Sequence, residues 1–188
     1  MPARYDKNLV ASLASSFPIG SEWRTILCRD VIVSNDQYLR ASWDVLNHLH
    51  QRAGVYAFLL PAEWFTPPRS ILLHAPHTHD GPIEFEFSVS ALPDSTHGVV
   101  YAGKTTDLKR RSRLHLSRGE TKDGGQVKFG VLNSNLFSSE DDALRAVREH
   151  GRIIYTELSG SDHVVNRDVL EIILCARFAP PFNIKSER

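Results

Sequence analysis

Two short apolar segments constrain the fold of this chain most strongly. The segment 55–60 reads VYAFLL and follows Gly54, and the segment 98–103 reads GVVYAG, with a glycine at each end. Short apolar runs that are rich in β-branched and aromatic residues and are flanked by turn residues are typical of buried strands. The sequence therefore predicts two buried strands, each of which carries a tyrosine.

The remaining elements alternate irregularly along the chain. We expect further strands at 70–75, 83–89 and 152–158, and helices at 36–52, from Thr105 or Thr106 onward, from Ser138 to Gly151 and at 167–178. Asn35 is the expected cap of the 36–52 helix, and Gly54 its expected end. Strands and helices that do not alternate regularly favour an α+β fold over a doubly wound parallel sheet.

Length and composition predict one folded domain. The chain has 188 residues, of which 41% are hydrophobic and 23% charged, as in ordinary globular proteins. No apolar run approaches the roughly 20 residues of a membrane span, and residues 1–18 lack the long apolar region of a signal peptide. Cys28 and Cys175 are too few for a disulfide framework. We therefore expect a cytoplasmic protein with reduced thiols and no membrane partner.

Positive charge is concentrated in one place, although the chain as a whole has 22 basic and 22 acidic residues. From Lys104 to Arg118 the basic residues and His115 face only one acid, Asp107. Such a patch is a candidate site for a phosphate-rich partner. The alternative is a solvated helix face whose charges pair with acids elsewhere in the chain.

Six features in order resemble the GIY-YIG nuclease superfamily, and its restriction-endonuclease-like members most closely in character. They are Gly54-Val55-Tyr56, Tyr101-Ala102-Gly103, Leu108-x-x-Arg111, His115, Glu171 within DVLEIILCARF, and Asn183 after Pro180-Pro181. The resemblance covers about residues 54–183. The chain departs from the family pattern in Ala102, where isoleucine is usual, and in the long separation between the two tyrosines.

The resemblance implies a fold and its division along the chain. It implies a small central antiparallel β-sheet flanked by helices, built from residues 54–188. A long insertion, 61–97, lies between the two motif strands, and residues 1–53 form an N-terminal extension with a helix. The insertion carries His74, His77, His79 and Asp80, which we interpret as loop residues rather than a zinc site because cysteines are absent there. Our hypothesis is that this insertion reaches a DNA groove.

The implied activity is that of a divalent-metal-dependent DNA endonuclease that hydrolyses phosphodiester bonds, in the manner of a type II restriction enzyme. The implied cofactor is Mg²⁺ or Mn²⁺, and the implied partner is DNA. One active site cuts one strand, so cleavage of both strands would need a homodimer or sequential nicking. A nuclease toxin or phage-defence effector is a second interpretation. An inactive nucleic-acid-binding module on the same scaffold is the third.

The resemblance also assigns roles to particular residues. Tyr56 and Tyr101 contact the attacking water, and one of them is the general base. Arg111 stabilises the transition state, and His115 orients a tyrosine or protonates the leaving oxygen. Asn183 braces the site. Phosphate contacts fall to Lys104, Lys109, Arg110 and Arg113.

Glu171 is the expected metal ligand. It lies in an otherwise apolar helical run, where a carboxylate needs a partner to offset its desolvation. A hard cation such as Mg²⁺, bound through one carboxylate, waters and substrate oxygens, would be such a partner. The alternatives are a lysine or arginine counter-ion, or simple exposure at a helix edge. For the tyrosines the alternative is core packing with one hydrated hydroxyl, and for His115 a plain hydrogen bond to a neighbour.

Overall fold

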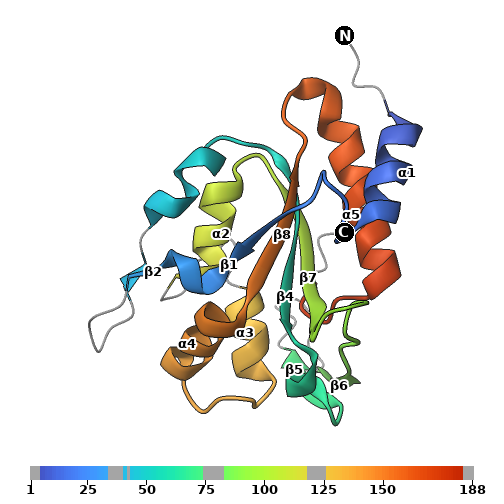
Figure 1. Cartoon of the computed structure of the whole chain (residues 1–188). Coiled ribbons are helices and arrows are strands. Elements are labelled where there is room, and N and C mark those ends of the chain that lie inside the picture. Colours follow the sequence, from blue (N-terminus) through green and yellow to red (C-terminus); the bar gives the residue numbers. More distant parts are fainter. Residues whose placement is uncertain (1–4, 34–39, 42, 74–82, 118–125, 184–188) are drawn as a thin grey trace.

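A four-stranded antiparallel sheet in the order β1-β8-β4-β7 forms the centre of the molecule (Figure 1). Its strands are β1 (Arg24–Leu27), β4 (Gly54–Pro61), β7 (His97–Thr105) and β8 (Arg152–Glu157). This computed structural model describes all residues except 1–4, 34–39, 42, 74–82, 118–125 and 184–188.

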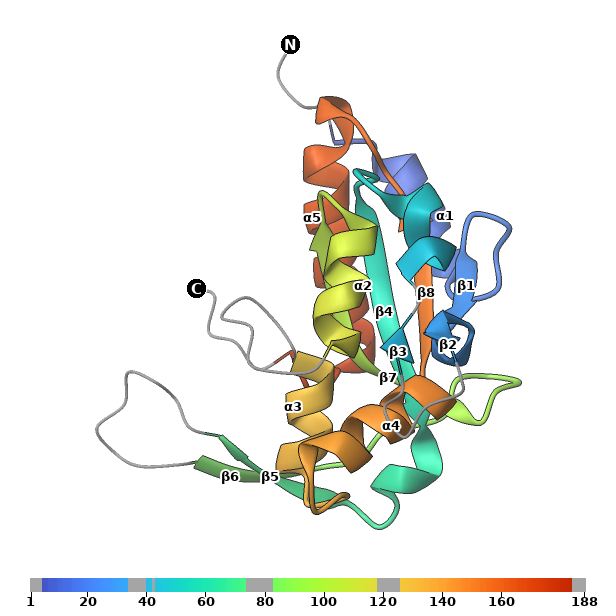
Figure 2. The ribbon, with the colours of Figure 1, turned by 90° about the vertical axis from the view of Figure 1, so that its left-hand side faces the viewer.

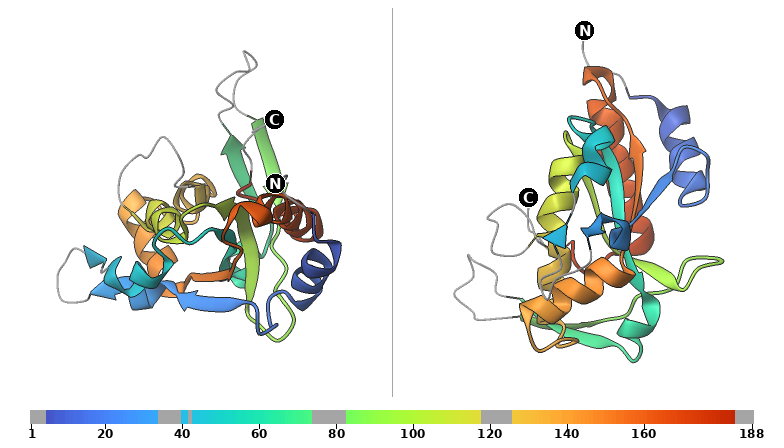
Figure 3. Two further views of the ribbon diagram at one scale, coloured as in Figure 1. Left: turned by 90° about the horizontal axis from the view of Figure 1, so that it is seen from above. Right: turned by 60° about the vertical axis from the view of Figure 1, so that its left-hand side comes forward.

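Helices cover both faces of this sheet, as the view from above shows (Figure 3). On one face lie α1 (Lys7–Ser16) and α5 (Val164–Phe178), and on the other lie α2 (Leu108–Leu116), α3 (Gln126–Asn133) and α4 (Glu140–His150). Side chains of a strand point alternately to the two faces. Val55 and Ala57 of β4 accordingly pack in the core with α1 and α5, whereas Tyr56 and Phe58 pack in the core with α2, α3 and α4.

The predicted fold class is confirmed at this level: an α+β protein with a small antiparallel sheet flanked by helices. The predicted strands at 55–60, 98–103 and 152–158 are present as β4, β7 and β8. The predicted helix after Ser138 is also present. Its N-terminal cap is Ser139, whose hydroxyl accepts a hydrogen bond from the Asp142 N–H at 3.1 Å.

The predicted helix at 36–52 is wrong over its described part. The chain forms the short strand β3 (Arg40–Ala41), paired with β2 (Ile32–Val33), and then the 3-10 helix η2 (Trp43–Leu49). Residues 36–39 and 42, and the proposed cap Asn35, lie outside the described residues. Gly54 does not end a helix but opens β4, where a Cβ would lie 2.2 Å from the Thr156 carbonyl oxygen. Strands β4 and β8 therefore approach each other too closely at this position for any residue with a side chain.

Other element boundaries differ from the expectation by a few residues. Helix α2 begins at Leu108 rather than at Thr105 or Thr106, because Thr105 still belongs to β7 and the Asp107 carboxylate caps the helix by accepting from the Arg110 N–H at 2.9 Å. Helix α5 begins at Val164, before the predicted 167.

The insertion contains the 3-10 helix η3 (Ala62–Phe65) and the hairpin β5 (Arg69–Leu73) and β6 (Ile83–Phe87). The hairpin extends away from the sheet beneath α3 (Figure 2). Its second strand ends before the predicted residue 89. The predicted end of the first strand at 74–75, the three histidines and Asp80 lie outside the described residues.

The N-terminal region is joined to the sheet at its β8 edge and to the helix α5 on one of its faces. Strand β1 pairs with β8, and helix α1 packs along α5, where the Arg177 Nη1 donates to the Ala14 carbonyl oxygen at 2.9 Å. The sequence did not reveal α1, β1 or α3. Within the described ranges, no helix has the length and apolar character needed to cross a membrane.

Helix α2 is held firmly at its C-terminal end. The buried Arg148 of α4 donates through Nε and Nη2 to the Leu116 carbonyl oxygen, at 2.9 and 2.6 Å. A cation at this position also opposes the negative end of the helix dipole. Arg148 therefore fixes the helix that carries Arg111 and His115.

We expect Arg148→Met to lower the free energy of unfolding by about 1–3 kcal/mol, because it leaves a buried carbonyl without its donor. Arg145→Met, at an exposed position of the same helix, should change it by less than about 0.5 kcal/mol. Urea denaturation followed by circular dichroism measures both. Equal effects of the two substitutions would contradict the anchoring role.

Candidate active site across the edge of strand β7

Two tyrosines meet on the α2 face of the sheet. Tyr56 of β4 and Tyr101 of β7 lie on adjacent strands, and their ring centroids are 5.9 Å apart. Gly103 pairs directly with Tyr56, and a Cβ at Gly103 would lie 3.0 Å from the Tyr56 hydroxyl oxygen and 2.9 Å from the Tyr101 ring. The glycine thus leaves the room that the two phenols need.

One guanidinium connects the two phenols. Arg111 donates from Nε to the Tyr56 hydroxyl at 3.0 Å and from Nη2 to the Tyr101 hydroxyl at 3.2 Å. The buried Leu108, one turn earlier on α2, packs in the same core as the tyrosines. The Leu-x-x-Arg spacing therefore places an apolar anchor and a cation on one face of the helix.

His115, one turn after Arg111, contacts the same phenol. Its Nε2 lies 3.0 Å from the Tyr56 hydroxyl, and its side chain is fully buried against Phe58 and Tyr101. Burial, together with the positive charge of Arg111, lowers the pKa of His115 to about 3. Its Nδ1 has no hydrogen-bond partner in the described part of the chain. His115 is therefore neutral, and its tautomer decides whether it accepts or donates the proton shared with Tyr56.

Tyr56 is held in the protonated form by its surroundings. Burial raises the pKa of Tyr56 well above 10, and the neighbouring Tyr101 raises it further, while the charge and hydrogen bond of Arg111 act in the opposite direction. An anion that binds Arg111 would offset its positive charge and would therefore change the pKa of Tyr56.

Glu171 and Asn183 lie at the outer edge of β7, on the side away from β4. In an edge strand the N–H and C=O groups of alternate residues point away from the sheet. At Ala102 the N–H donates to Asn183 Oδ1 at 2.7 Å, and the carbonyl accepts from Asn183 Nδ2 at 2.5 Å. At Lys104 the N–H donates to Glu171 Oε1 at 3.1 Å. Both side chains therefore satisfy the open edge of the strand that carries Tyr101.

Lys104 pairs with two acids of helix α5. Its Nζ lies 2.9 Å from Asp168 Oδ1 and 3.2 Å from Glu171 Oε2. The hydrogen bond to Asp168 is the largest cause and raises the pKa of Lys104; burial, the next largest, lowers it, and the charge of Glu171 raises it again, so that the pKa is raised on balance. The alternative of a lysine counter-ion for Glu171 is thus the one seen in the structure. Sequence reasoning missed Asp168, although its position one turn before Glu171 was a usable signal.

A pocket of about 240 Å³ lies between β7 and α2. It is lined by Lys104, Thr105, Arg110, Arg111 and Leu114. Three of these residues are cationic, and a guanidinium can hold two oxygens of a phosphate at once. Lys104 contributes to the pocket and also contacts Glu171, so it connects the acid on one face of β7 with the arginine on the other.

The other two predicted phosphate-binding residues, Lys109 and Arg113, lie against η2. The ammonium group of Lys109 donates to the Asn47 side chain, and the Arg113 guanidinium lies 5.3 Å from the centroid of the Trp43 ring. Neither residue lines the pocket. The cationic segment is therefore divided between the site and the contact with η2.

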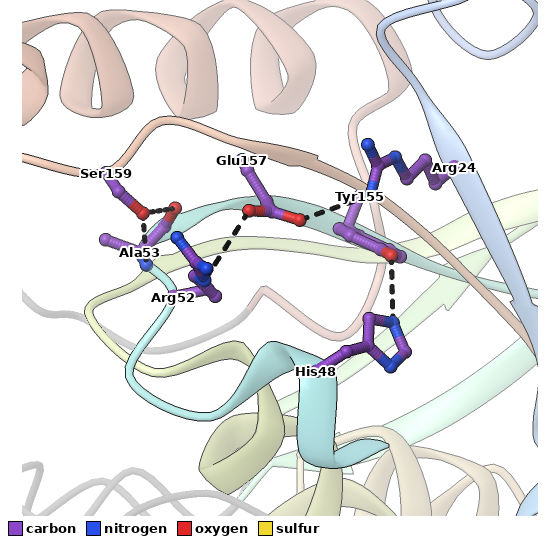
Figure 4. Close-up of polar contacts among 7 residues, drawn as sticks. All are labelled: Arg24, His48, Arg52, Ala53, Tyr155, Glu157 and Ser159. Carbon is purple, nitrogen blue, oxygen red and sulfur yellow. Dashed lines mark hydrogen bonds and ion pairs between the residues drawn. The ribbon is translucent and has the colours of Figure 1, made fainter. Parts of the chain in front are cut away.

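A further set of polar contacts attaches the η2 region to β8 (Figure 4). Tyr155 pairs with Tyr56 across the sheet, and its hydroxyl lies 3.4 Å from His48 Nε2. Glu157 lies between Arg24 at 3.4 Å and Arg52 at 4.0 Å. These contacts were not predicted, because they join segments that are far apart in the sequence. They hold η2 beside the sheet, where it supports α2.

Glu171 is the residue that the resemblance predicts to hold a metal ion. The described residues contain no group of three or more acidic, histidine or cysteine side chains that could surround an ion. Mg²⁺ commonly binds through one or two carboxylates and completes its shell with waters and substrate oxygens. Glu171 could supply one such carboxylate; it does not line the pocket but contacts Lys104, which does.

No family model, curated protein or solved structure matches this chain. The interpretation of the site therefore depends on its own geometry and on the sequence motifs.

We expect the folded protein to lose stability through His115 as the pH falls from 6.5 toward 3. In that range the unfolded chain binds a proton at His115 that the folded protein excludes, which costs up to ~1.4 kcal/mol per pH unit. His115→Gln should show a correspondingly shallower loss in urea denaturation at a series of pH values. An NMR titration that gives His115 a pKa near 6.5 would contradict the expectation.

Proposed function

We propose that this protein is a divalent-metal-dependent DNA endonuclease of the GIY-YIG type, acting in the cytoplasm. The observation that carries the proposal is the Arg111 guanidinium, which bonds two phenols from adjacent strands and lines a cationic pocket next to Lys104 and Glu171. A type II restriction-like enzyme is the form we propose, working as a homodimer or by sequential nicking on duplex DNA.

Hydrolysis of a phosphodiester needs a positioned water, a base for its proton, and positive charge around the phosphorus as negative charge develops there. In the proposed complex the scissile phosphate lies in the pocket against Arg111, with Arg110 and Lys104 at its sides. Arg111 is well suited to the developing charge, because the Tyr56 and Tyr101 hydroxyls hold its planar group in one orientation.

Tyr56 is the proposed base. Its hydroxyl contacts both Arg111 and His115, so a proton taken from water can be balanced by one passed to the neutral imidazole. A bound phosphodiester places a negative charge beside Arg111, which offsets the smaller of the two causes that lower the pKa of His115; burial, the larger cause, remains and keeps the transfer of a proton to this imidazole brief. Tyr101 shares the guanidinium and would orient the water.

Glu171 would hold Mg²⁺ or Mn²⁺, which supplies Lewis-acid stabilisation of the phosphate charge when it is bound. The main-chain N–H of Lys104 fixes Glu171 Oε1 and leaves Oε2 as the exchangeable oxygen. Asn183, through its two bonds to Ala102, holds the strand between Tyr101 and Lys104 in place. The products would be a 5′-phosphate and a 3′-hydroxyl.

A catalytically inactive nucleic-acid-binding module is the second candidate. The observation in its favour is that both Glu171 oxygens already contact Lys104, which explains the carboxylate without a metal ion. This candidate does not account for the buried contact of Tyr56 with both Arg111 and His115.

We expect Glu171→Gln to reduce cleavage of supercoiled plasmid in Mg²⁺ by at least about a hundredfold, with DNA binding retained. Glu149→Gln, at an exposed position of α4, should cut at the wild-type rate. Gel analysis of nicked and linear products, followed by sequencing of the ends, measures the effect. Failure of the wild-type protein to cut DNA in Mg²⁺ and in Mn²⁺ would rule out the nuclease and favour the binding module.

A further inference from the structure

Lys104 engages two carboxylates of helix α5 at the same time. Its ammonium lies closer to Asp168, at 2.9 Å, than to Glu171, at 3.2 Å. Its main-chain N–H holds the other oxygen of Glu171 at 3.1 Å. Lys104 therefore contacts both oxygens of Glu171, one through its main-chain N–H and one through its ammonium. Asp168 competes with Glu171 only for the ammonium.

The positions of the two acids explain this arrangement. Asp168 and Glu171 are three residues apart on α5, so their side chains lie on one face of the helix, where like charges repel each other. An ammonium group has three donors and can satisfy both acids. The side chains of Lys104 and Asp168 are 43% and 45% exposed, whereas that of Glu171 is 24% exposed. The lysine can therefore change partner in contact with water.

A divalent cation at Glu171 would compete with this ammonium. The main-chain N–H of Lys104 orients Oε1, and Oε2 is the oxygen that Lys104 Nζ contacts, so an ion that binds Glu171 through Oε2 meets the ammonium directly. Two cations at one carboxylate oxygen repel each other strongly at such short distances. The ammonium must therefore move away from Oε2, and Asp168 is already its nearer partner.

We propose that Asp168 is a positioning residue that retains the Lys104 ammonium and so frees Glu171 Oε2 for a divalent cation. The inference rests on the proposed function, in which Glu171 holds the ion. Asp168 acts through Lys104 and touches neither DNA nor the reacting atoms. Without the Asp168 carboxylate, the Lys104 ammonium keeps only Glu171 of these two acids. It then stays on Oε2 and excludes the ion more effectively.

The test is Mn²⁺ binding to the full chain without DNA, measured from the electron paramagnetic resonance signal of free Mn²⁺. Four proteins are compared: the wild type, Asp168→Asn, Lys104→Met and the double variant. Asp168→Asn should weaken Mn²⁺ binding about tenfold when Lys104 is present and less than about threefold in the Lys104→Met background. Asp162→Asn removes an exposed charge of the neighbouring η4 (Ser161–His163), and should change binding less than about twofold.

Equal weakening in both backgrounds would overturn the proposal, because Asp168 would then act as a ligand or through its charge alone. The Lys104→Met variant should still bind Mn²⁺, and adding Glu171→Gln to it should abolish that binding. If Lys104→Met shows no Mn²⁺ binding that depends on Glu171, the proposal is also overturned. Plasmid cleavage separates the two hypotheses. If cleavage depends on Glu171 but Mn²⁺ binding shows no coupling between Asp168 and Lys104, the nuclease function is supported and the positioning role of Asp168 is refuted. If Mn²⁺ binding shows this coupling but the protein does not cut DNA, the positioning role is supported and the nuclease function is refuted.

Discussion

The two hydrogen bonds from Arg111 to the hydroxyls of Tyr56 and Tyr101 are the interaction on which the rest of the site depends. They join helix α2 to strands β4 and β7. They also place the Arg111 guanidinium against the two buried tyrosines. Much of the surrounding structure serves to keep this arrangement in place. Arg148 fixes the end of α2, and the contacts that His48 of η2 and the following Arg52 make with β8 hold the neighbouring η2 in place. In the proposed function, a planar cation held in one orientation would be organised in advance for charge that develops on a phosphate.

Strand β7 brings the two halves of the site together because it is the edge strand of the central sheet. Its inner neighbour β4 supplies Tyr56, while its outer edge is open to side chains from α5 and the segment after it. Glu171 and Asn183 cover that edge by accepting main-chain hydrogen bonds, as edge strands require if they are not to pair with another chain. The same bonds orient the Glu171 carboxylate at Lys104, a residue that lines the cationic pocket. One set of contacts thus supports both the fold and the proposed chemistry.

Local patterns in the sequence predicted helix α4 and three of the four central strands, β4, β7 and β8, with a tyrosine on each of the first two. The resemblance named Arg111 and His115, which share a face of α2 because they are four residues apart. Contacts between distant segments were not predictable in this way. The cation–π contact of Arg113 with Trp43, for example, depends on η2, whose spacing of apolar residues resembled that of an α-helix. Asp168 was missed because its importance depends on Lys104, which reaches it only in the folded chain.

The most direct test of the central claim is the rate of plasmid cleavage by Arg111→Lys compared with that of Arg113→Lys. Both substitutions keep the charge of α2, but a lysine at 111 cannot bond both phenols and hold two phosphate oxygens. The account predicts a loss of at least about a hundredfold for Arg111→Lys, with DNA binding retained, and little change for Arg113→Lys, whose side chain lies over Trp43. Wild-type cleavage by Arg111→Lys would contradict the account.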